Sequence, residues 1–189
     1  MKQRDYITFL TRLEKLKCNT RHCYTTSGRR ESVAEHSWRL AVMAMMTRDE
    51  YPELDIDRVI KMCLIHDIGE AVTGDVPSFY KTAENEAAED DAVSGLISGL
   101  SDELRSEFAA LFSEMNAMET DEARLYKALD NMEAVLAHNE SDLSTWIPLE
   151  YSENLVYGEK NCEFSDWTRK LRAVLKEDSM EKIRKEGNK

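Results

Sequence analysis

Glycine and proline are scarce in this sequence, which contains 7 glycines and 3 prolines among 189 residues. Both residues interrupt helices, so their scarcity favours long helices. No segment alternates apolar and polar residues for long enough to predict a strand, and no internal repeat divides the chain. With 42% hydrophobic residues, the chain has enough apolar material for one core. The sequence therefore predicts an all-α protein with a single domain over residues 1–189.

The sequence also lacks long apolar runs and has few positive charges. Its longest apolar run, residues 40–46, is far shorter than the roughly 20 residues that cross a bilayer. Its 25 lysines and arginines face 37 acidic residues, which gives a net charge of −12. Proteins that coat nucleic acid or an anionic membrane surface need a positive face. Polymeric nucleic acid and membranes are therefore not expected partners, whereas a small anionic substrate is compatible with a local group of cations.

Paired cysteines are missing as well. None of the four cysteines belongs to a C-x-x-C motif, and Cys63 lies in an apolar stretch, where a buried free thiol is common. The start of the sequence, MKQRDYITFL, carries charges within its first five residues and lacks the apolar region of a signal peptide. These features predict reduced thiols and a cytoplasmic protein.

Helix-start and helix-end signals divide the chain into segments. Ser32 followed by Glu35 forms a capping-box pattern, and Asp55 or Asp57 is expected to cap the next helix. Residues 18–31 are polar and without periodicity, which predicts a long loop, and residues 140–165 give no clear pattern. The expected helices cover residues 6–16, 32–50, 55–74 and 83–100, followed by helices from Ser101 and from Thr120 and a last helix or helix pair over 165–185.

The segment CLIHDIGEAVTGDV places a histidine beside an aspartate after an apolar run. On a helix, the side chains of His66 and Asp67 can both reach one small ion, and Glu70 projects from the same face as His66. Imidazole and carboxylate suit a divalent ion such as Mn, Co, Fe or Zn, and a nearby carboxylate can take the proton of a water. The structural alternative is a half-buried histidine that hydrogen-bonds Asp67 or a backbone carbonyl.

Two further candidates lie outside this segment. His36 is expected in the first turn of its helix, where backbone N–H groups and the helix dipole favour anions. Asp130 lies in LYKALDNMEAVL, among leucines, where a carboxylate is usually paired or bound to metal. The alternative for His36 is a hydrogen bond to Glu35 or to a loop. For Asp130 it is an ion pair with Lys127, although this lysine could instead meet a phosphate oxygen.

Together these residues form the ordered pattern H…HD…D, and the chain thereby resembles the HD-domain superfamily of metal-dependent phosphohydrolases. The similarity extends to its short, 5′-deoxynucleotidase-like branch. RRESVAEHSWRLAVMA is similar to the R-x-E-S/N-V-S/A-E-H segment of that branch, HDIGEAVTGDVP to its H-D-x-x-E-x-x-x-G-D-x-P, and KALD to its K-x-x-D. The resemblance covers about residues 6–140. It implies an HD-type helical bundle with its motif core at about residues 30–140 and the C-terminal helices packed on it.

The resemblance also implies roles for individual residues. The metal ligands would be His36, His66, Asp67 and Asp130. Glu70 would act on the water, and Asp75 would orient water, leaving group or sugar; a turn or helix cap is the alternative for Asp75. Substrate contacts would come from Arg21, Arg29, His36, Asp75, Val76, Pro77, Ser78 and Lys127.

At one position the sequence departs from this branch. Relatives tend to have a tryptophan after the arginine that corresponds to Arg21, whereas this sequence has His22. The resemblance therefore does not fix the preference for base or sugar. Arg29 adds positive charge to the loop before His36, with pairing to Glu35 as the alternative. His138 is expected to be exposed and is given no chemical role.

These observations lead to the hypothesis of a phosphomonoester hydrolase that acts on (deoxy)nucleoside 5′-monophosphates with one divalent ion, Mn, Co, Fe, Zn or Mg. One ion is expected because the extra histidines of two-metal HD phosphodiesterases have no counterpart here. The first alternative is hydrolysis of another nucleotide, such as a dNTP, a cyclic dinucleotide or an alarmone. The second is a non-catalytic helical module that binds nucleotide or metal. A homodimer is a further expectation from the resemblance.

Overall fold

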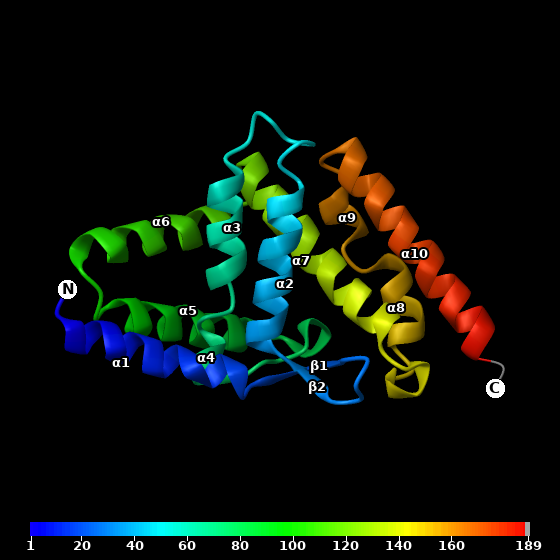
Figure 1. Ribbon diagram of the computed structural model, residues 1–189, viewed down its shortest axis with the longest axis horizontal. Coiled ribbons are helices and arrows are strands. Elements are labelled where there is room, and N and C mark those ends of the chain that lie inside the picture. Colours follow the sequence, from blue (N-terminus) through cyan, green and yellow to red (C-terminus); the bar gives the residue numbers. More distant parts are fainter. Residues whose placement is uncertain (188–189) are drawn as a thin grey trace.

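Helices α2 (Val33–Met46) and α3 (Ile56–Ile65) run antiparallel at the centre of the structure, where α7 (Asp121–Glu140) crosses them (Figure 1). This computed structural model describes residues 1–187. On one side of the centre lie α1 (Gln3–Leu13), η1 (Glu14–Lys17), α4 (Glu70–Thr73), α5 (Ala83–Ile97) and α6 (Asp102–Ala117). The loop between α4 and α5, which contains η2 (Ser78–Tyr80), reaches back past α2. On the other side lie η3 (Leu143–Thr145), α8 (Glu150–Val156), α9 (Glu159–Cys162) and α10 (Asp166–Glu186). The helical fold expected from the sequence is confirmed.

Side chains that cap helices set the starts of the central helices. Ser32 accepts a hydrogen bond from the backbone N–H of Glu35, whose carboxylate accepts the backbone N–H of Ser32 in return. This reciprocal pair is the capping box expected from the sequence, and it fixes the start of α2. The side chains of Asp55 and Thr120 cap α3 and α7 in the same way.

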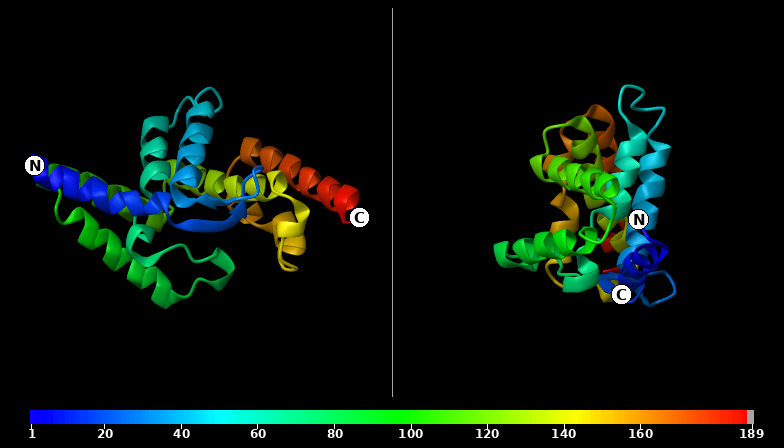
Figure 2. Two further views of the ribbon diagram at one scale, coloured as in Figure 1. Left: turned by 60° about the horizontal axis from the view of Figure 1, so that its bottom comes forward. Right: turned by 90° about the vertical axis from the view of Figure 1, so that its left-hand side faces the viewer.

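The stretch expected as a long loop contains a hairpin of two antiparallel strands, β1 (Thr20–Tyr24) and β2 (Arg30–Ser32). The prediction of a loop without strands is therefore wrong for these residues. The strands are short and their register shifts between Thr20 and Tyr24, so they show little of the alternation by which a strand is found in a sequence. The turn between them uses Gly28 at a φ of 82°, a conformation that suits glycine. The hairpin lies against the end of α7 (Figure 2).

The helix that carries the HD dipeptide ends earlier than expected. Helix α3 stops at Ile65, and residues 66–69 form turns before the short α4. Gly69 lets α5 pack closely against this turn, because a Cβ on it would lie 3.0 Å from the backbone oxygen of Glu89 in α5. The expected continuous helix to residues 69–74 is therefore wrong, as is the extension of α2 beyond Met46 to about residue 50. His66 and Asp67 leave the end of a helix rather than one helical face.

One apolar core holds the three central helices together. Leu125, Leu129 and Met132 of α7 are fully buried against Leu40 of α2 and Met62 of α3. Each such side chain stabilises the fold by about 1.5–3 kcal/mol on burial. Because the three helices are packed together, the polar side chains attached to them beside the core are held in fixed positions.

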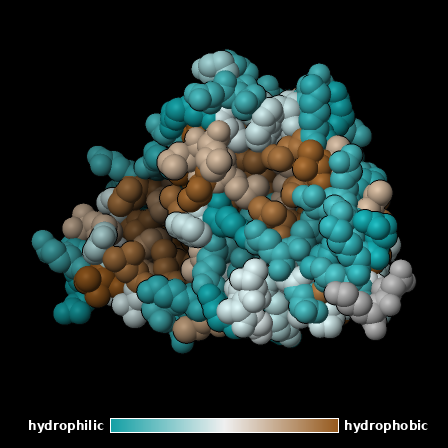
Figure 3. Space-filling view, turned by 45° about the vertical axis from the view of Figure 1, so that its right-hand side comes forward, coloured by the Kyte–Doolittle hydropathy of each residue, from teal (hydrophilic) through white to brown (hydrophobic). Residues whose placement is uncertain are grey.

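Apolar side chains also reach the surface, where brown areas interrupt the polar atoms (Figure 3). On α2, Trp38 and Met46 are 65% and 75% exposed. Within residues 1–187, no helix combines the length and the apolar character needed to cross a bilayer.

All four cysteines are free thiols in the described part of the chain, in agreement with the expectation of reduced thiols. Cys18 is exposed, whereas Cys23, Cys63 and Cys162 are buried. Burial raises the pKa of Cys23 to about 12 and that of Cys162 to about 11. These thiols are therefore protonated at neutral pH and pack as small apolar groups.

Candidate functional site

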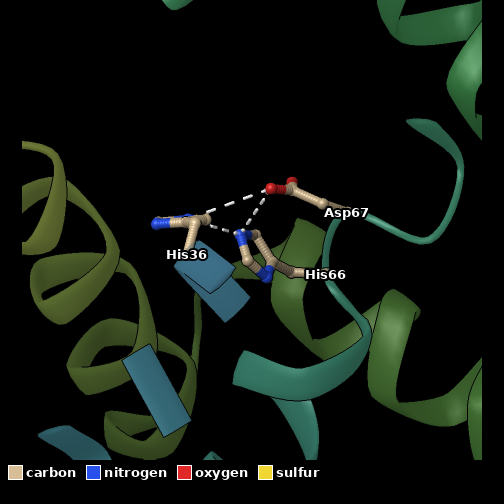
Figure 4. Close-up of side chains that lie close together, drawn as sticks. All are labelled: His36, His66 and Asp67. Carbon is tan, nitrogen blue, oxygen red and sulfur yellow. Dashed lines mark hydrogen bonds and ion pairs between the residues drawn. The ribbon is translucent and has the colours of Figure 1, made fainter. Parts of the chain in front are cut away.

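Four side chains from separate elements converge on one point. His36 comes from α2, His66 and Asp67 follow α3, and Asp130 comes from α7. Figure 4 shows the first three, with the nitrogen atoms of the two rings and a carboxylate oxygen of Asp67 facing one another. His36 Nε2 lies 3.2 Å from His66 Nε2 and 3.2 Å from Asp130 Oδ1. His66 Nε2 lies 3.0 Å from Asp67 Oδ2 and 3.6 Å from Asp130 Oδ1.

These distances are similar to the distances between neighbouring ligand atoms around one small metal ion. Nitrogen and oxygen ligands lie about 2.0–2.2 Å from an ion such as zinc, so neighbouring ligands are about 3.0–3.6 Å from each other. The observed distances of 3.0–3.6 Å fall in this range, and His36 Nε2 lies slightly farther, 3.9 Å, from Asp67 Oδ2. His36, His66 and Asp67 place one ligand atom each within 4.8 Å of the others, as around one ion, and Asp130 Oδ1 lies next to the two imidazoles.

The hydrogen bonds of the two imidazoles explain why they need a cation between them. His66 Nδ1 lies 2.9 Å from the carbonyl oxygen of Cys63, which can only accept, so Nδ1 carries the proton. His36 Nδ1 likewise faces a carboxylate oxygen of Glu133. In the neutral rings, both Nε2 atoms then present lone pairs to each other at 3.2 Å. A proton or a metal ion relieves this repulsion, and the donor set of two imidazoles and two carboxylates fits a divalent ion.

The charges around the four side chains favour the same conclusion. Burial raises the pKa of Asp67, but the contact with His66 outweighs it and the pKa is lowered. Burial also opposes ionisation of Asp130, whose pKa is nevertheless held well below its usual range by Lys127 and His36. Burial and Arg21 lower the pKa of His36, yet the carboxylates of Glu133 and Asp130 raise it to about 9. An ion bound at His36 Nε2 would displace this proton, so its binding would be stronger at higher pH.

Glu133, one turn after Asp130 on α7, is a site residue that the sequence analysis missed. It is completely buried, and its Oε1 accepts a hydrogen bond of 2.6 Å from Arg39 Nε. Arg21 Nη2 lies 3.9 Å from its Oε2. Burial opposes ionisation of Glu133, but His36 and Arg21 lower its pKa to about 2. A signal was present in the sequence, because this glutamate lies among the apolar residues of NMEAVL, as Asp130 lies among leucines.

The two aspartates of this set, Asp67 and Asp130, line a cavity together with most of the expected substrate residues. His36 and His66 are not among the described residues that line the cavity. Phe79, Ala134 and several residues of α8 contribute to the walls. The lining residues include Arg21, His22, Cys23, Asp67, Glu70, Asp75, Val76, Pro77, Ser78, Phe79, Lys81, Lys127, Asp130, Ala134, His138, Glu150, Glu153, Asn154 and Tyr157.

Two acidic side chains stand beside the aspartate ligands in this cavity. Glu70 is buried, and burial together with Asp67 and Asp75 raises its pKa to about 10. Its Oε2 has no hydrogen-bond partner in residues 1–187. Burial likewise raises the pKa of Asp75. Both groups hold protons more readily than ordinary carboxylates, which suits proton transfer.

Two cationic side chains bring positive charge to the same cavity. Lys127 Nζ lies 2.7 Å from Asp130 Oδ2, so the ion pair considered as the alternative is formed. Arg21 lies 3.6 Å from Glu31, and the charges around it raise its pKa although burial opposes this. Each cation keeps a carboxylate partner and also lines the cavity, where a phosphate would meet it.

Two residues are found in unexpected surroundings. Arg29 forms a two-pronged ion pair with Glu35, one contact being 2.8 Å, and its side chain is 58% exposed. It is not among the described residues that line the cavity. His138, expected to be exposed, is instead largely buried and lines the cavity, so that prediction is wrong. Helix α8 and the hairpin cover this end of α7, and no pattern in residues 140–165 predicted α8.

Comparisons with known proteins agree with this geometry. The family model described as "HD domain" matches residues 13–172. The 5′-deoxynucleotidase HDDC2 of Mus musculus is 34% identical over 119 residues, which cover 62% of this chain and 59% of the mouse protein. The chain therefore matches about three fifths of that relative's length. The resemblance expected from the motifs is confirmed.

Solved structures show the same fold. The crystal structure of a predicted metal-dependent phosphohydrolase from Magnetospirillum magnetotacticum MS-1 is similar with a TM-score of 0.78 and 32% identity, over 95% of this chain and 93% of that one. The HD phosphohydrolase DatZ of cyanophage S-2L, solved with dA and one catalytic Zn²⁺ ion, is similar with a TM-score of 0.60 and 20% identity. The match covers 93% of this chain and 96% of that one. At this identity, the second similarity concerns the fold alone.

Proposed function

Because the chain belongs to the HD domain family, we propose that it is a metal-dependent phosphohydrolase that releases phosphate from (deoxy)nucleoside 5′-monophosphates. The observation that carries this proposal is the meeting of two imidazole nitrogens and two carboxylates at the edge of a cavity with buried acids and cations. The name of the mouse relative, 5′-deoxynucleotidase, supports the nucleotide substrate.

The proposed cofactor is a single divalent ion held by His36, His66, Asp67 and Asp130. Their nitrogen and oxygen donors are compatible with Mn, Co, Fe, Zn or Mg. When bound, the ion supplies a Lewis acid that polarises phosphate and water, and its charge brings the pKa of Glu70 back toward neutrality.

The proposed phosphate position lies between Asp130 and Arg21. Lys127 and Arg21 line the cavity there, and both can donate hydrogen bonds to phosphate oxygens. Phosphoryl transfer depends mainly on placing the reacting groups in line and on neutralising charge, and these side chains serve both purposes. Val76, Pro77 and Ser78 form the adjoining wall, where the rest of the substrate would pass.

Glu70 is the proposed general base. Its Oε2 is buried in the cavity without a hydrogen-bond partner elsewhere in the described chain, so it is available to a water molecule. In this role Glu70 takes the proton of the attacking water, and Asp75 orients the water or the leaving oxygen. A carboxylate with a raised pKa also returns a proton readily, which completes the cycle.

The test begins with metal analysis of the purified protein, followed by phosphate release from a panel of ribo- and deoxynucleotides. We expect inorganic phosphate and nucleoside, and we expect D67A to lose both metal and activity while it stays folded. D91A, which removes an exposed aspartate of α5, is the matched control. Release of pyrophosphate or tripolyphosphate would support hydrolysis of another nucleotide instead. Failure of every divalent ion to stimulate hydrolysis would support a non-catalytic binding module.

The expectations about location and assembly remain part of the proposal. A cytoplasmic location agrees with the free thiols, and fractionation of cells that produce the protein tests it. The homodimer expected from the family resemblance is tested by light scattering of the purified chain at several concentrations. A concentration-independent monomer mass would contradict it.

A further inference from the structure

The cavity extends away from the ligand set along α7. Asp130, Ala134 and His138 line it, and their spacing places them on one face of the helix. The eight residues from Asp130 to His138 correspond to about 12 Å at the helical rise. The cavity therefore has a first end at Asp130, where the phosphate is proposed to bind, and a second end at His138. The distance between these ends is similar to the length of one mononucleotide.

Helix α8 closes the second end with two buried polar side chains. Glu150 is 1% exposed and Asn154 is 4% exposed, and both line the cavity. They lie four residues apart, so both project from the same face of α8. Glu150 Oε2 accepts a 2.8 Å hydrogen bond from the backbone N–H of Ile147, which leaves Oε1 available to another partner.

On each of these two side chains, one polar atom lacks a hydrogen bond within the described residues. Across residues 1–187, Glu150 Oε1 and Asn154 Nδ2 have no hydrogen-bond partner. Buried polar atoms without partners are rare because each costs about 1–3 kcal/mol, so each needs an explanation. One atom is an acceptor and the other a donor, and together they match a ligand with a donor beside an acceptor.

Two imidazoles lie close to Glu150 without completing its hydrogen bonds. His22 Nε2 is 3.1 Å and His138 Nε2 is 3.2 Å from Oε1, but neither contact is aligned as a hydrogen bond. His138 Nε2 already faces Cys23 Sγ at 3.3 Å. Burial lowers the pKa of His138 to about 4, so this ring is neutral at pH 7 and brings no charge to the carboxylate.

Aromatic surface adjoins the two polar atoms. The rings of His22 and Phe79 lie 6.3 Å apart, edge to face, and both residues line the cavity. Planar bases stack on such rings, and each stacked base gains about 1–3 kcal/mol in other nucleic-acid sites. Phosphate and sugar offer no comparable flat apolar surface.

The polar atoms are also held rigidly. Arg172 of α10 is buried and donates 2.9 Å hydrogen bonds to the backbone oxygens of Asn154 and Tyr157. The chain then turns at Gly158, with a φ of 73°, directly against the side chain of Asn131 in α7. Helix α8 is thereby fixed to both α7 and α10, and a ligand finds its partners already in place.

We propose that this end of the cavity binds the nucleobase of the substrate, with Glu150 Oε1 accepting an N–H of the base and Asn154 Nδ2 donating to its neighbouring ring nitrogen or carbonyl. The inference rests on the proposed function and deepens it: the preferred substrates are nucleotides rather than sugar phosphates. Glu150 and Asn154 determine this specificity and take no part in the chemical step.

The experiment compares 2′-deoxynucleoside 5′-monophosphates with deoxyribose 5-phosphate and ribose 5-phosphate, which lack a base. In E150Q and N154L we expect kcat/KM for the nucleotides to fall about 10- to 100-fold, the value of a hydrogen bond to a charged or buried group. Hydrolysis of deoxyribose 5-phosphate should not change. E159Q, which makes the same chemical change at a residue paired with Lys176 outside the cavity, is the control and should behave as wild type.

Other outcomes overturn the inference. An equal loss for nucleotides and for sugar phosphates, or no loss in either variant, would remove the base-binding role and leave the proposed function intact. A loss shared by nucleotides and ribose 5-phosphate but not deoxyribose 5-phosphate would assign the polar pair to a sugar hydroxyl. Circular dichroism at the assay temperature verifies that the variants are folded.

A binding measurement separates this inference from failure of the proposed function. If the wild type hydrolyses no phosphomonoester, calorimetric titration with deoxyadenosine, deoxycytidine, deoxyguanosine and thymidine still tests the site. Binding to the wild type that is about 10-fold weaker in E150Q supports the inference. No binding of any nucleoside, or equal binding by both proteins, overturns it.

Discussion

Glu133 accepts the Nδ1–H of His36 in the interior of the protein, so a proposed metal ligand on α2 is oriented by a carboxylate on α7. The same carboxylate binds Arg39 and lies near Arg21, which lines the cavity. One buried glutamate thus joins the ligand set to the proposed phosphate site. Partners of this kind fix the ring and its tautomer, and they affect a metal site nearly as much as the ligands do.

For E133Q we expect metal binding about 10- to 100-fold weaker, because the amide cannot balance the charges of His36 and Arg39. Calorimetric titration of the metal-free protein with Mn²⁺ or Zn²⁺ measures this. E140Q is the matched control, since the exposed carboxylate of Glu140 also pairs with Arg39. An equal loss in both variants would assign the effect to Arg39 rather than to Glu133.

For E70Q we expect metal content like that of the wild type and a kcat about 10²- to 10⁴-fold lower, because the amide cannot accept the proton of water. Elemental analysis and phosphate release measure the two quantities on the same sample. E86Q, at an exposed position of α5, should match the wild type in both. Loss of metal in E70Q would make Glu70 a ligand instead of the base.

For R29A we expect an unchanged KM and an unchanged midpoint of urea unfolding, because the Arg29–Glu35 pair is exposed. R21A, by contrast, should lower kcat/KM by at least about 10-fold, because Arg21 lines the cavity. Steady-state kinetics of both variants measure KM and kcat/KM. An R29A KM that rises as much as that of R21A would show that the hairpin turn moves onto the substrate.

The stability of the protein should fall on acidification, and His138 accounts for part of this. Burial lowers its folded pKa to about 4, below the ordinary value of about 6.5, so only the unfolded chain takes up the proton between these values. The contribution of His138 to the free energy of unfolding is therefore fully present above pH 6.5 and is lost as the pH falls toward 4. Between pH 7.5 and 4.5 the wild type should lose on the order of 2 kcal/mol more than H138Q in urea unfolding. Equal losses would mean that His138 is protonated in the folded protein.

Local signals allowed much of the site to be predicted. The capping pattern of Ser32 and Glu35 set the start of α2, and this places His36 one turn inside the helix. The apolar stripe of α7 made Asp130 stand out as a polar residue that needed a partner. Such features depend on neighbours in the sequence, and they are visible without the fold.

Other parts of the site depend on contacts between distant segments. His138 is buried because α8 and the hairpin meet over it, and the partner of Glu133 lies 97 residues away at His36. The turn after Ile65 packs closely against α5 at Gly69, which is 20 residues before its contact at Glu89. No local pattern encodes these contacts, so the sequence could not indicate the buried wall made by Glu150 and Asn154.

The wall of the cavity opposite the candidate ligand set comes from a separate stretch of the chain. The candidate ligands lie in α2, α7 and the turn after α3, whereas this wall belongs to α8, which Arg172 anchors to α10. Under the proposed function, substitutions in α8 would alter which phosphate ester is preferred without touching the residues proposed to bind the metal. Substrate preference and catalytic rate could then evolve separately.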